Sequence, residues 1–471
     1  MKRPVKQISV FRIAAIAAIG GFLFGYDTGV IGGTQLFFTE YFGLTPAQQG
    51  WAVSSALYGC FVGALVAGYL TKSIGRKHTL ILSAVLFSVS AWGSGVADSL
   101  TELVIYRIIG GLGIGFASMA APMYIAEVSP AHLRGRMVSL YQLAIVLGFF
   151  CVFLATYYIG GGDASVLQDA QLAAMHEQNL NEGWRTMFWS ELPVALVFLA
   201  LLFFVPYSPR WLMLKGDQTS SLQVLEQLLG DESKAKAELA SIDASLDEQQ
   251  ISSVRGLIAA GLGVAVVIGL LLSVFQQTSG INAILYYGAE IFSNALGYGP
   301  QDALKQQLWL GAVNLAFTFV AIFTVDRWGR KPLYLIGTAG MVVSLLLLGV
   351  MIYTNSLGIV SLVAILMFVG SFAMSMGPIV WVVISEMFPN RARSMGMAIA
   401  VGAQWFMNGV VANSFPVVNR SALNVEAFNG ALPYFLFALF CLIAFIFAWR
   451  YVPETKGKSL EEIESLWRHS S

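Results

Sequence analysis

Long stretches of apolar residues, each about as long as a membrane-spanning helix, recur along the whole chain. A helix needs about 20 consecutive, mostly apolar residues to cross a bilayer. The seventh stretch is longer than one span needs and is interrupted by Ser279 and Gly280, so it predicts a broken helix. The sequence therefore predicts an all-α membrane protein with twelve transmembrane helices, at residues 11–33, 51–71, 79–97, 102–126, 138–159, 187–205, 258–292, 306–325, 333–353, 358–384, 395–415 and 432–450.

Lysine and arginine gather at one end of these predicted helices. The N-terminus, the even-numbered connections and the C-terminus carry most of the 27 basic residues. The exceptions are Arg185, Lys305 and Arg420 at the other end, and Arg107 inside a span. Cytoplasmic loops carry the excess of positive charge in membrane proteins. We therefore expect a multi-pass protein of the plasma (inner) membrane, with both termini in the cytoplasm.

One long polar stretch divides the twelve spans into two sets of six. Within it, leucines at helical spacing predict short amphipathic helices on the inner face of the membrane. The predicted organisation is a six-helix half at 1–205, linker helices at 206–257, a second six-helix half at 258–451 and a cytoplasmic tail at 452–471.

The two predicted halves repeat one another in sequence. A Gly-Arg-Lys motif follows span 2 at 75–77 and recurs after span 8 at 329–331. A glutamate follows span 4 and span 10, in each case with an arginine seven residues later. Repeated landmarks in the same order indicate an internal duplication, which is typical of secondary transporters.

The repeated charges at the inner ends of the spans have a predicted use as a latch. Arginines at these helix ends could pair with Glu127, Glu386 and Glu454 across the seam between the halves, holding the inner side shut until it opens. Anchoring of helix ends to lipid headgroups is the alternative, but the acids repeat together with the arginines, which favours pairing. The predicted gating residues are Arg76, Glu127, Arg134, Arg330, Glu386, Arg393 and Glu454.

Composition narrows the function classes. Hydrophobic residues make up 57% of the chain and charged residues 11%, so most of the chain must face lipid or other spans rather than water. The formal net charge of zero argues against a nucleic-acid partner. Neither the 3 cysteines nor the 4 histidines form a metal-ligand pattern, and no nucleotide-binding loop or nucleophile–base set is present. We expect no enzyme activity, no bound metal and no organic cofactor.

Seven short motifs, from Phe24-Gly25-Tyr26-Asp27 near the start of the chain to Pro453-Glu454-Thr455-Lys456-Gly457 near its end, resemble those of the sugar porter family of the major facilitator superfamily. One departure is Tyr207, which stands where the family pattern has a glutamate. The resemblance implies alternating access, a monosaccharide substrate, a proton as coupling ion and a monomer in the lipid bilayer. It is carried by Phe24-Gly25-Tyr26-Asp27, Tyr106-Arg107-Ile108-Ile109-Gly110-Gly111, Gln276-Gln277 to Gly280-Ile281-Asn282, Asp326-Arg327-Trp328-Gly329-Arg330-Lys331, Gly377-Pro378 to Trp381, Gln404-Trp405 and Pro453-Glu454-Thr455-Lys456-Gly457.

Neutral amides within the spans are candidates for binding sugar hydroxyls, because each amide offers both a donor and an acceptor. An isolated amide is costly in lipid, so it should face a polar cavity or another helix. Hydrogen bonding between helices, at about 0.6 kcal/mol per contact, is the alternative use. Aromatic rings beside these amides, or beside a predicted kink at Gly377 and Pro378, would cover the apolar faces of the sugar. The predicted sugar-binding residues are Phe24, Gln142, Gln276, Gln277, Asn282, Tyr286, Asn314, Gly377, Trp381, Gln404 and Trp405.

Asp27 and Arg107 are charged residues inside predicted spans. A charge there costs about 2.5–3.5 kcal/mol on insertion, so such residues default to a functional role. We expect Asp27 to take up a proton from outside and release Arg107, after which sugar binding permits the inward swing. A static buried ion pair is the alternative, and Glu191 either assists the pair or faces the outer loop.

These patterns together predict a proton-coupled monosaccharide symporter. A facilitative sugar uniporter, in which Asp27 is only structural, is the nearest alternative. A sugar-sensing membrane receptor is a third possibility, which the short predicted cytoplasmic tail disfavours.

Overall fold

The computed structural model describes residues 9–130, 133–163, 167–246, 251, 253–295 and 297–456. Within these ranges every regular element is a helix. Twelve of the helical segments are long and apolar enough to cross a membrane, which confirms the predicted fold class.

The first six spans are built from eight α-helices and one π-helical turn. Their bounds are α1 Val10–Tyr41, α2 Pro46–Ser73, α3 Arg76–Val96, α4 Leu100–Val128, α5 Arg134–Ile159, α6 Asp169–Gln178, η1 Asn179–Gly183, α7 Trp184–Trp189 and α8 Leu192–Leu202. The sixth span runs from Asp169 to Leu202, so the segment before residue 187 that the sequence treats as an outer loop is largely helical.

Four short helices follow, and then six further spans. The short helices are α9 Pro209–Leu214, α10 Gln218–Leu229, α11 Glu232–Leu246 and α12 Val254–Ala259. The remaining elements are α13 Gly263–Thr278, α14 Ile281–Tyr286, α15 Gly288–Glu290, η2 Ile291–Ala295, α16 Pro300–Trp328, α17 Arg330–Tyr353, α18 Ile359–Met374, α19 Met376–Met387, α20 Asn390–Asn419, η3 Leu423–Ala427 and α21 Leu432–Tyr451.

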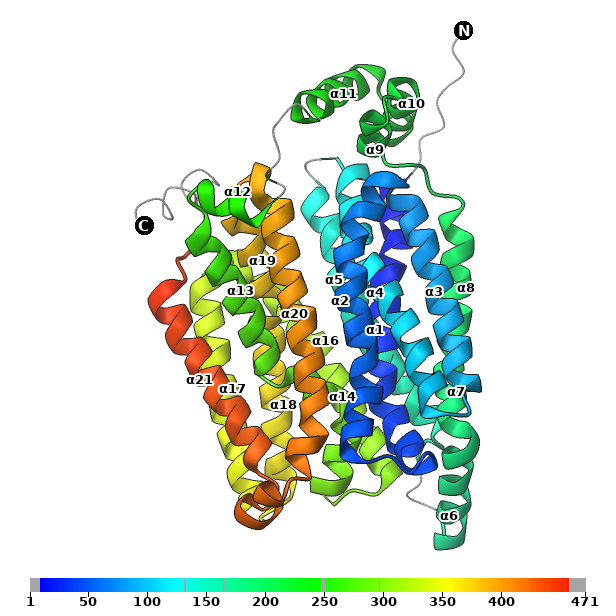
Figure 1. Cartoon of the computed structure of the whole chain (residues 1–471), viewed down its shortest axis with the longest axis vertical. Coiled ribbons are helices and arrows are strands. Elements are labelled where there is room, and N and C mark those ends of the chain that lie inside the picture. The colour runs from blue at the N-terminus through cyan, green and yellow to red at the C-terminus, as the bar shows by residue number, and fades with distance from the viewer. Residues whose placement is uncertain are drawn as a thin grey trace.

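The spans form two bundles that stand side by side. Helices α1–α8 form one bundle and α13–α21 the other, while α9, α10 and α11 lie across one end (Figure 1). We call this end the inner end and the opposite end the outer end. The first span begins and the last span ends at the inner end.

Glycine allows the helices of the first bundle to meet backbone to backbone. A side chain at Gly25 on α1 would collide with the carbonyl oxygen of Ile145 on α5. In the same way, a side chain at Gly111 on α4 would collide with the carbonyl oxygen of Ala56 on α2. Small residues at such crossings are how membrane helices pack closely.

The two bundles touch at the outer end. Gln49 on α2 donates a hydrogen bond to Glu290 on α15 at 2.7 Å. Lys305 on α16 lies 3.8 Å from Asp163, which follows α5. These contacts join the two bundles at the outer end.

Two of the second-bundle spans are broken at mid-length. The seventh span stops at Thr278 and resumes at Ile281, which confirms the predicted interruption. Gly280 sits in the break with φ +86°, a conformation that other residues adopt only with strain. The span begins at Gly263 rather than 258, because Gly261 at φ +78° ends α12 first. The tenth span breaks at Ser375, two residues before the Gly377–Pro378 pair predicted to kink it.

Candidate functional site

Gln276 connects the two broken spans. Its Nε2 donates to the carbonyl oxygens of Met376, at 2.9 Å, and Gly377, at 3.0 Å, both in the first turn of α19. The side chain is 2% exposed. Because one amide holds both breaks together, a ligand that competes for its hydrogen bonds would act on both spans at once.

Three further predicted amides extend from Gln276 into one network. Gln404 on α20 donates to Oε1 of Gln276, and Gln277 donates to the same oxygen at 3.2 Å. Asn282 on α14 donates to Oε1 of Gln277 at 2.7 Å. Buried amides are costly unless they are hydrogen-bonded, and here they bond one another across the break, although among the described residues no donor reaches Oε1 of Gln404. We call these four residues, Gln276, Gln277, Asn282 and Gln404, the amide network.

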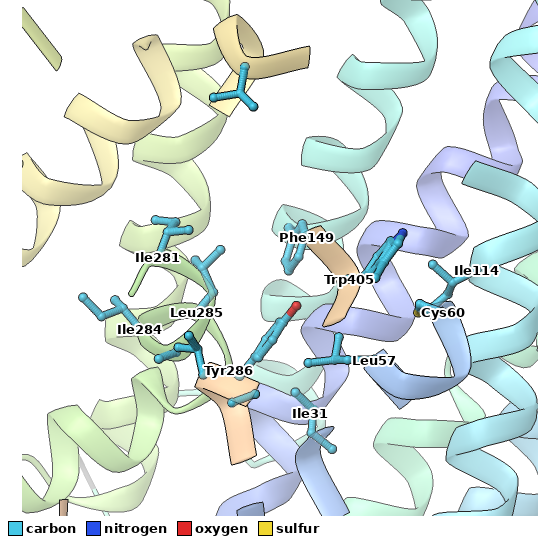
Figure 2. Packing of buried hydrophobic residues seen from close by; sticks show 14 of the residues in the cluster. Ile31, Leu57, Cys60, Ile114, Phe149, Ile281, Ile284, Leu285, Tyr286 and Trp405 are labelled. Carbon is cyan, nitrogen blue, oxygen red and sulfur yellow. The ribbon is translucent and has the colours of Figure 1, made fainter. Parts of the chain in front are cut away.

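Aromatic rings flank the amide network. Phe24 on α1 packs against Trp405 on α20, with ring centroids 5.3 Å apart, so this contact joins the two bundles. Tyr286 accepts a hydrogen bond from Asn408 at 3.2 Å. Figure 2 shows Tyr286 and Trp405 among the buried residues at the junction of the bundles, together with Phe149 of α5.

Asn408 is a site residue that the sequence reasoning missed. It is 3% exposed and lies four residues, or about one helical turn, after Gln404 on the same face of α20. That spacing was the signal that could have found it. Among the described residues, no donor reaches Oδ1 of Asn408, so this oxygen is available to a ligand.

Three predicted sugar-binding side chains belong neither to the amide network nor to the aromatic rings described beside it. Gln142 on α5 and Trp381 on α19 are half-buried, and Asn314 on α16 is 9% exposed. In the described part of the chain, the side chains of Gln142 and Asn314 make no hydrogen bond to another residue. Their assignment to the sugar remains a prediction.

Asp27 and Arg107 form a buried ion pair in the first bundle. One guanidinium nitrogen of Arg107, on α4, contacts Oδ1 of Asp27, and the other donates to the Asp27 carbonyl oxygen at 3.0 Å. Each residue is 1% exposed. The guanidinium also lies 5.6 Å from the ring centroid of Phe188 on α7. Such a pair, deep inside the bundle, is expensive to break unless a proton neutralises the acid.

Glu191 is a third charged residue at the same place. It lies between α7 and α8, is 1% exposed, and is close enough to interact with both Asp27 and Arg107. Among the described residues, no donor reaches either oxygen of Glu191 or Oδ2 of Asp27. Two carboxylates this close repel unless one carries a proton, and a proton between them would satisfy both. Of the two predicted roles, assisting the pair is the one this geometry supports.

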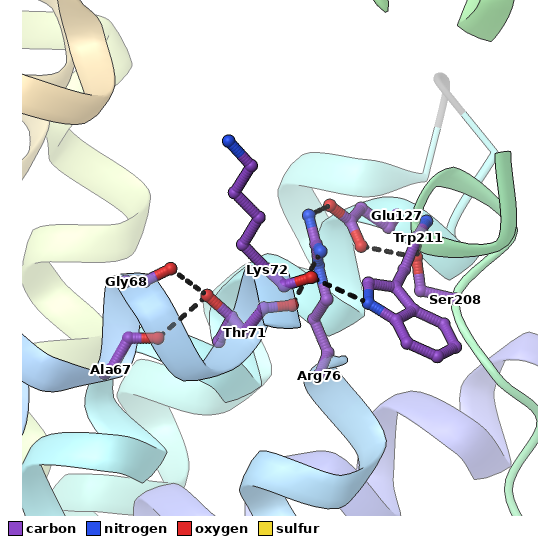
Figure 3. Close-up of polar contacts among 8 residues, drawn as sticks. All are labelled: Ala67, Gly68, Thr71, Lys72, Arg76, Glu127, Ser208 and Trp211. Carbon is purple, nitrogen blue, oxygen red and sulfur yellow. Dashed lines mark hydrogen bonds and ion pairs between the residues drawn. The ribbon is translucent and has the colours of Figure 1, made fainter. Parts of the chain in front are cut away.

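In the described ranges of this structure, the predicted latch residues pair within each bundle and not across the seam, and their pairing across the seam remains a prediction. Arg76 on α3 donates to Glu127 on α4 at 2.7 Å, and both belong to the first bundle (Figure 3). Arg330 on α17 donates to Glu386 on α19 at 2.9 Å, and both belong to the second. The reason is geometric: adjacent antiparallel helices bring the start of one beside the end of the other within a single bundle.

The remaining predicted latch residues also bond within their own bundles or stand apart. Arg134 donates from Nε to the carbonyl oxygen of Ala126 at 3.0 Å. Glu454 accepts from the backbone N–H groups of Arg330, at 3.1 Å, and Lys331, at 3.0 Å. Arg393 is half-buried on α20, and nothing in the described ranges bonds its Nε.

No metal site is formed in the part of the chain that the structure describes. No group of three or more His, Cys, Asp or Glu residues there could hold an ion. Cys60, Cys151 and Cys441 are free thiols. The site residues that the structure describes are Asp27, Arg107 and Glu191 in the first bundle and the amide network in the second.

Comparison with known proteins places these features in a family. Residues 13–467 match the family model described as "Sugar (and other) transporter". The chain is 42% identical to the D-xylose-proton symporter of Escherichia coli strain K12, over 97% of this chain and 96% of that protein. It is 36% identical to the glucose facilitated diffusion protein of Zymomonas mobilis, over 99% of each chain.

Solved structures agree with this placement. The inward open conformation of the xylose transporter of Escherichia coli matches with a TM-score of 0.83 and 40% identity, covering 97% of this chain and 100% of that one. The same transporter bound to 6-bromo-6-deoxy-D-glucose matches with a TM-score of 0.79 and 42% identity, covering 97% and 99%.

Proposed function

Because this chain belongs to the sugar transporter family, we propose that it carries a monosaccharide into the cell together with a proton. The single observation that supports proton coupling is the cluster of Asp27, Arg107 and Glu191, in which two carboxyl groups and one guanidinium are buried together in the first bundle. A facilitator needs no such group, since it moves sugar down its own gradient.

The amide network of the second bundle is the proposed sugar site. Its four side chains now bond one another, and a sugar would replace these bonds with bonds to its hydroxyls. Asn408 adds an acceptor, while Phe24 and Trp405 cover an apolar face of the ring. Each hydrogen bond contributes about 0.5–1.5 kcal/mol net, so the affinity is moderate and release remains possible.

The proton switch works through the charge balance at Asp27. While Asp27 is ionised, the Arg107 guanidinium holds both its carboxylate and its backbone. A proton on Asp27 removes the charge that binds the guanidinium and frees α1 to move against α4. Glu191 is close enough to Asp27 to share or accept that proton.

Helix α1 connects the proton to the sugar. It carries Asp27 and, one turn earlier, Phe24, whose ring packs on Trp405 of the second bundle. A shift of α1 on proton uptake therefore changes the contact beside the amide network. Substrate and proton act on the same moving element, which is what coupling requires.

The proposed setting is the plasma membrane. The protein works as a multi-pass monomer with both termini in the cytoplasm, as the distribution of basic residues predicts. Glu386, Arg330 and their counterparts then lie on the cytoplasmic side, where they hold the inner rim of each bundle together.

Transport assays in sealed vesicles test the proposal. Purified protein in proteoliposomes should accumulate labelled sugar when a proton gradient points inward, and should exchange sugar without one. D-Xylose and D-glucose are the first probes, because relatives named for these sugars are 42% and 36% identical to this chain. Exchange that is unaffected by the gradient, with no accumulation, would instead identify a facilitator.

A further inference from the structure

A cavity with polar lining residues lies between the bundles at the outer end, away from the amide network. Its volume is about 490 Å³, within the range of about 300–1,000 Å³ that is usual for small-molecule sites. The first bundle contributes the end of α1, the turn after it, the start of α2 and part of α6. The second bundle contributes α15, η2, the first residue of α16 and Arg420.

Buried amides in this cavity have free hydrogen-bonding groups. Gln35 is 0% exposed and Gln49 is 1% exposed. Gln49 donates to Oε1 of Gln35 at 2.6 Å, which uses one end of each amide. Within the described ranges, nothing bonds Nε2 of Gln35, Oε1 of Gln49 or the hydroxyl of Thr39, and all three residues line the cavity.

The charged residues of the cavity already contact one another, since Glu290 pairs with Arg420 and Glu40 lies 3.2 Å from the imidazole of His176. Glu290 is 3% exposed and accepts from Arg420 at 2.8 Å through one oxygen and from Gln49 at 2.7 Å through the other. What is left for a ligand is an amide donor, an amide acceptor and a hydroxyl. Neutral groups of both kinds suit a molecule with many hydroxyls and favour neither an anion nor a cation.

We propose that this cavity is a second sugar site, which binds a monosaccharide from the external solution. The inference rests on the proposed function, since it assumes that the chain meets sugar at its outer face. Both bundles line the site, and the Gln49–Glu290 bond exists only while they are together there. An occupant therefore stabilises the arrangement in which the bundles are joined at the outer end, and high external sugar slows entry.

Binding stoichiometry tests the proposal directly. Equilibrium dialysis of the purified full chain against labelled D-xylose, with D-glucose in parallel, should show two sites per chain. Gln35→Leu should weaken the outer site about tenfold or more and leave the other unchanged. Gln276→Ala should do the reverse. Thr34→Val is the matched control on α1, because the Thr34 hydroxyl bonds only within its own helix, and it should retain both sites.

Uptake kinetics give a second readout. Wild-type proteoliposomes should show inhibition of entry at high external sugar, and Gln35→Leu should relieve it without changing uptake at low sugar. A single site that Gln276→Ala abolishes and Gln35→Leu leaves intact would overturn the outer site while the proposed function stands. Absence of both sugar binding and sugar transport in the wild type would instead remove the proposed function itself.

Discussion

The two bundles share a backbone plan at the inner end but differ in chemistry. Gly75, before α3, has φ +89° and ψ 163°, and Gly329, before α17, has φ +93° and ψ 166°. A side chain at Gly75 would meet the indole of Trp211, whereas one at Gly329 would meet the carboxylate of Glu454. The duplicated framework has therefore kept its fold while the groups that stabilise it have changed.

A similar set of hydrogen bonds, which we call a clamp, is found near each of these glycines. In the first bundle, Glu127 accepts from Arg76 and, at 2.5 Å, from the Ser208 hydroxyl (Figure 3). In the second bundle, Glu386 accepts from Arg330 and, at 2.6 Å, from the Thr455 hydroxyl. Each clamp is one carboxylate that receives one guanidinium and one hydroxyl.

The caps of the following helices differ. Glu454 accepts two backbone N–H groups at the start of α17, where a negative charge stabilises a helix. Tyr207 takes the corresponding place in the first bundle, stacked on Trp211 and lying 4.9 Å beneath Lys77 Nζ. Electrostatic capping in one bundle is replaced by aromatic packing in the other.

The functional groups are divided in the same manner. The first bundle holds the three charged residues of the proton cluster, and the second holds the four residues of the amide network. On the proposed function, the duplication supplied the symmetry for alternating access, and later divergence separated the proposed proton site from the proposed sugar site.

The largest expected effect comes from replacing Asp27, the carboxylate of the buried ion pair in the first bundle. Asp27→Asn eliminates the group that takes up the proton, so vesicles should no longer accumulate sugar above the external concentration. Exchange of labelled for unlabelled sugar should persist, because the amide network is intact. Accumulation at the wild-type level in Asp27→Asn would contradict the division of labour between the bundles.

A substitution in the second bundle should produce the opposite pattern. Gln276→Ala removes two or more hydrogen bonds to the sugar at about 0.5–1.5 kcal/mol each, which raises KM roughly tenfold or more. The sugar-to-proton ratio should stay unchanged in simultaneous flux measurements. Gln142→Ala, outside the network, should raise KM less; the reverse order would relocate the sugar site towards α5.

The two clamps should contribute differently to the stability of the protein, because their side chains are buried to different degrees. Glu127→Gln and Glu386→Gln each remove a charge-assisted contact, at a cost of about 1.5–3 kcal/mol. The first should lower the thermal unfolding temperature more, because the Arg76–Glu127 side chains are 8% and 9% exposed against 14% and 26% for Arg330–Glu386. Equal decreases in the unfolding temperatures of the two purified variants would show that burial does not determine which clamp stabilises the protein more.

The smallest effects should come from substitutions at Glu454 and Tyr207, which take corresponding places beside the starts of α17 and α3. Glu454→Gln weakens the two bonds at the start of α17, at a cost of about 1 kcal/mol. Tyr207→Glu offers a carboxylate to the start of α3 but loses the stacking on Trp211, so the net change should be smaller. If Tyr207→Glu lowered the thermal unfolding temperature more than Glu454→Gln does, the aromatic packing would stabilise the protein more than the electrostatic cap.

The order of apolar and polar residues in the sequence predicted the transmembrane spans well, but it predicted poorly which residues contact one another. All twelve spans and the break at Ser279–Gly280 follow from apolar run length and from glycine's backbone freedom, which are local properties. The partner of Glu127 does not, because pairing depends on which helix ends meet in space. The outer cavity escaped for the same reason, because it becomes visible only once α2 lies beside α15. Asn408 could have been found from its spacing, four residues after Gln404, but its bond to Tyr286 becomes visible only once α20 lies beside α14.

Simultaneous recording of sugar and proton movement tests the central claim most directly. Sugar added outside weakly buffered proteoliposomes, with no imposed gradient, should make the external solution more alkaline as sugar and protons enter together. Asp27→Asn should abolish the pH change. Sugar entry in the wild type without any change in external pH would contradict proton-coupled transport.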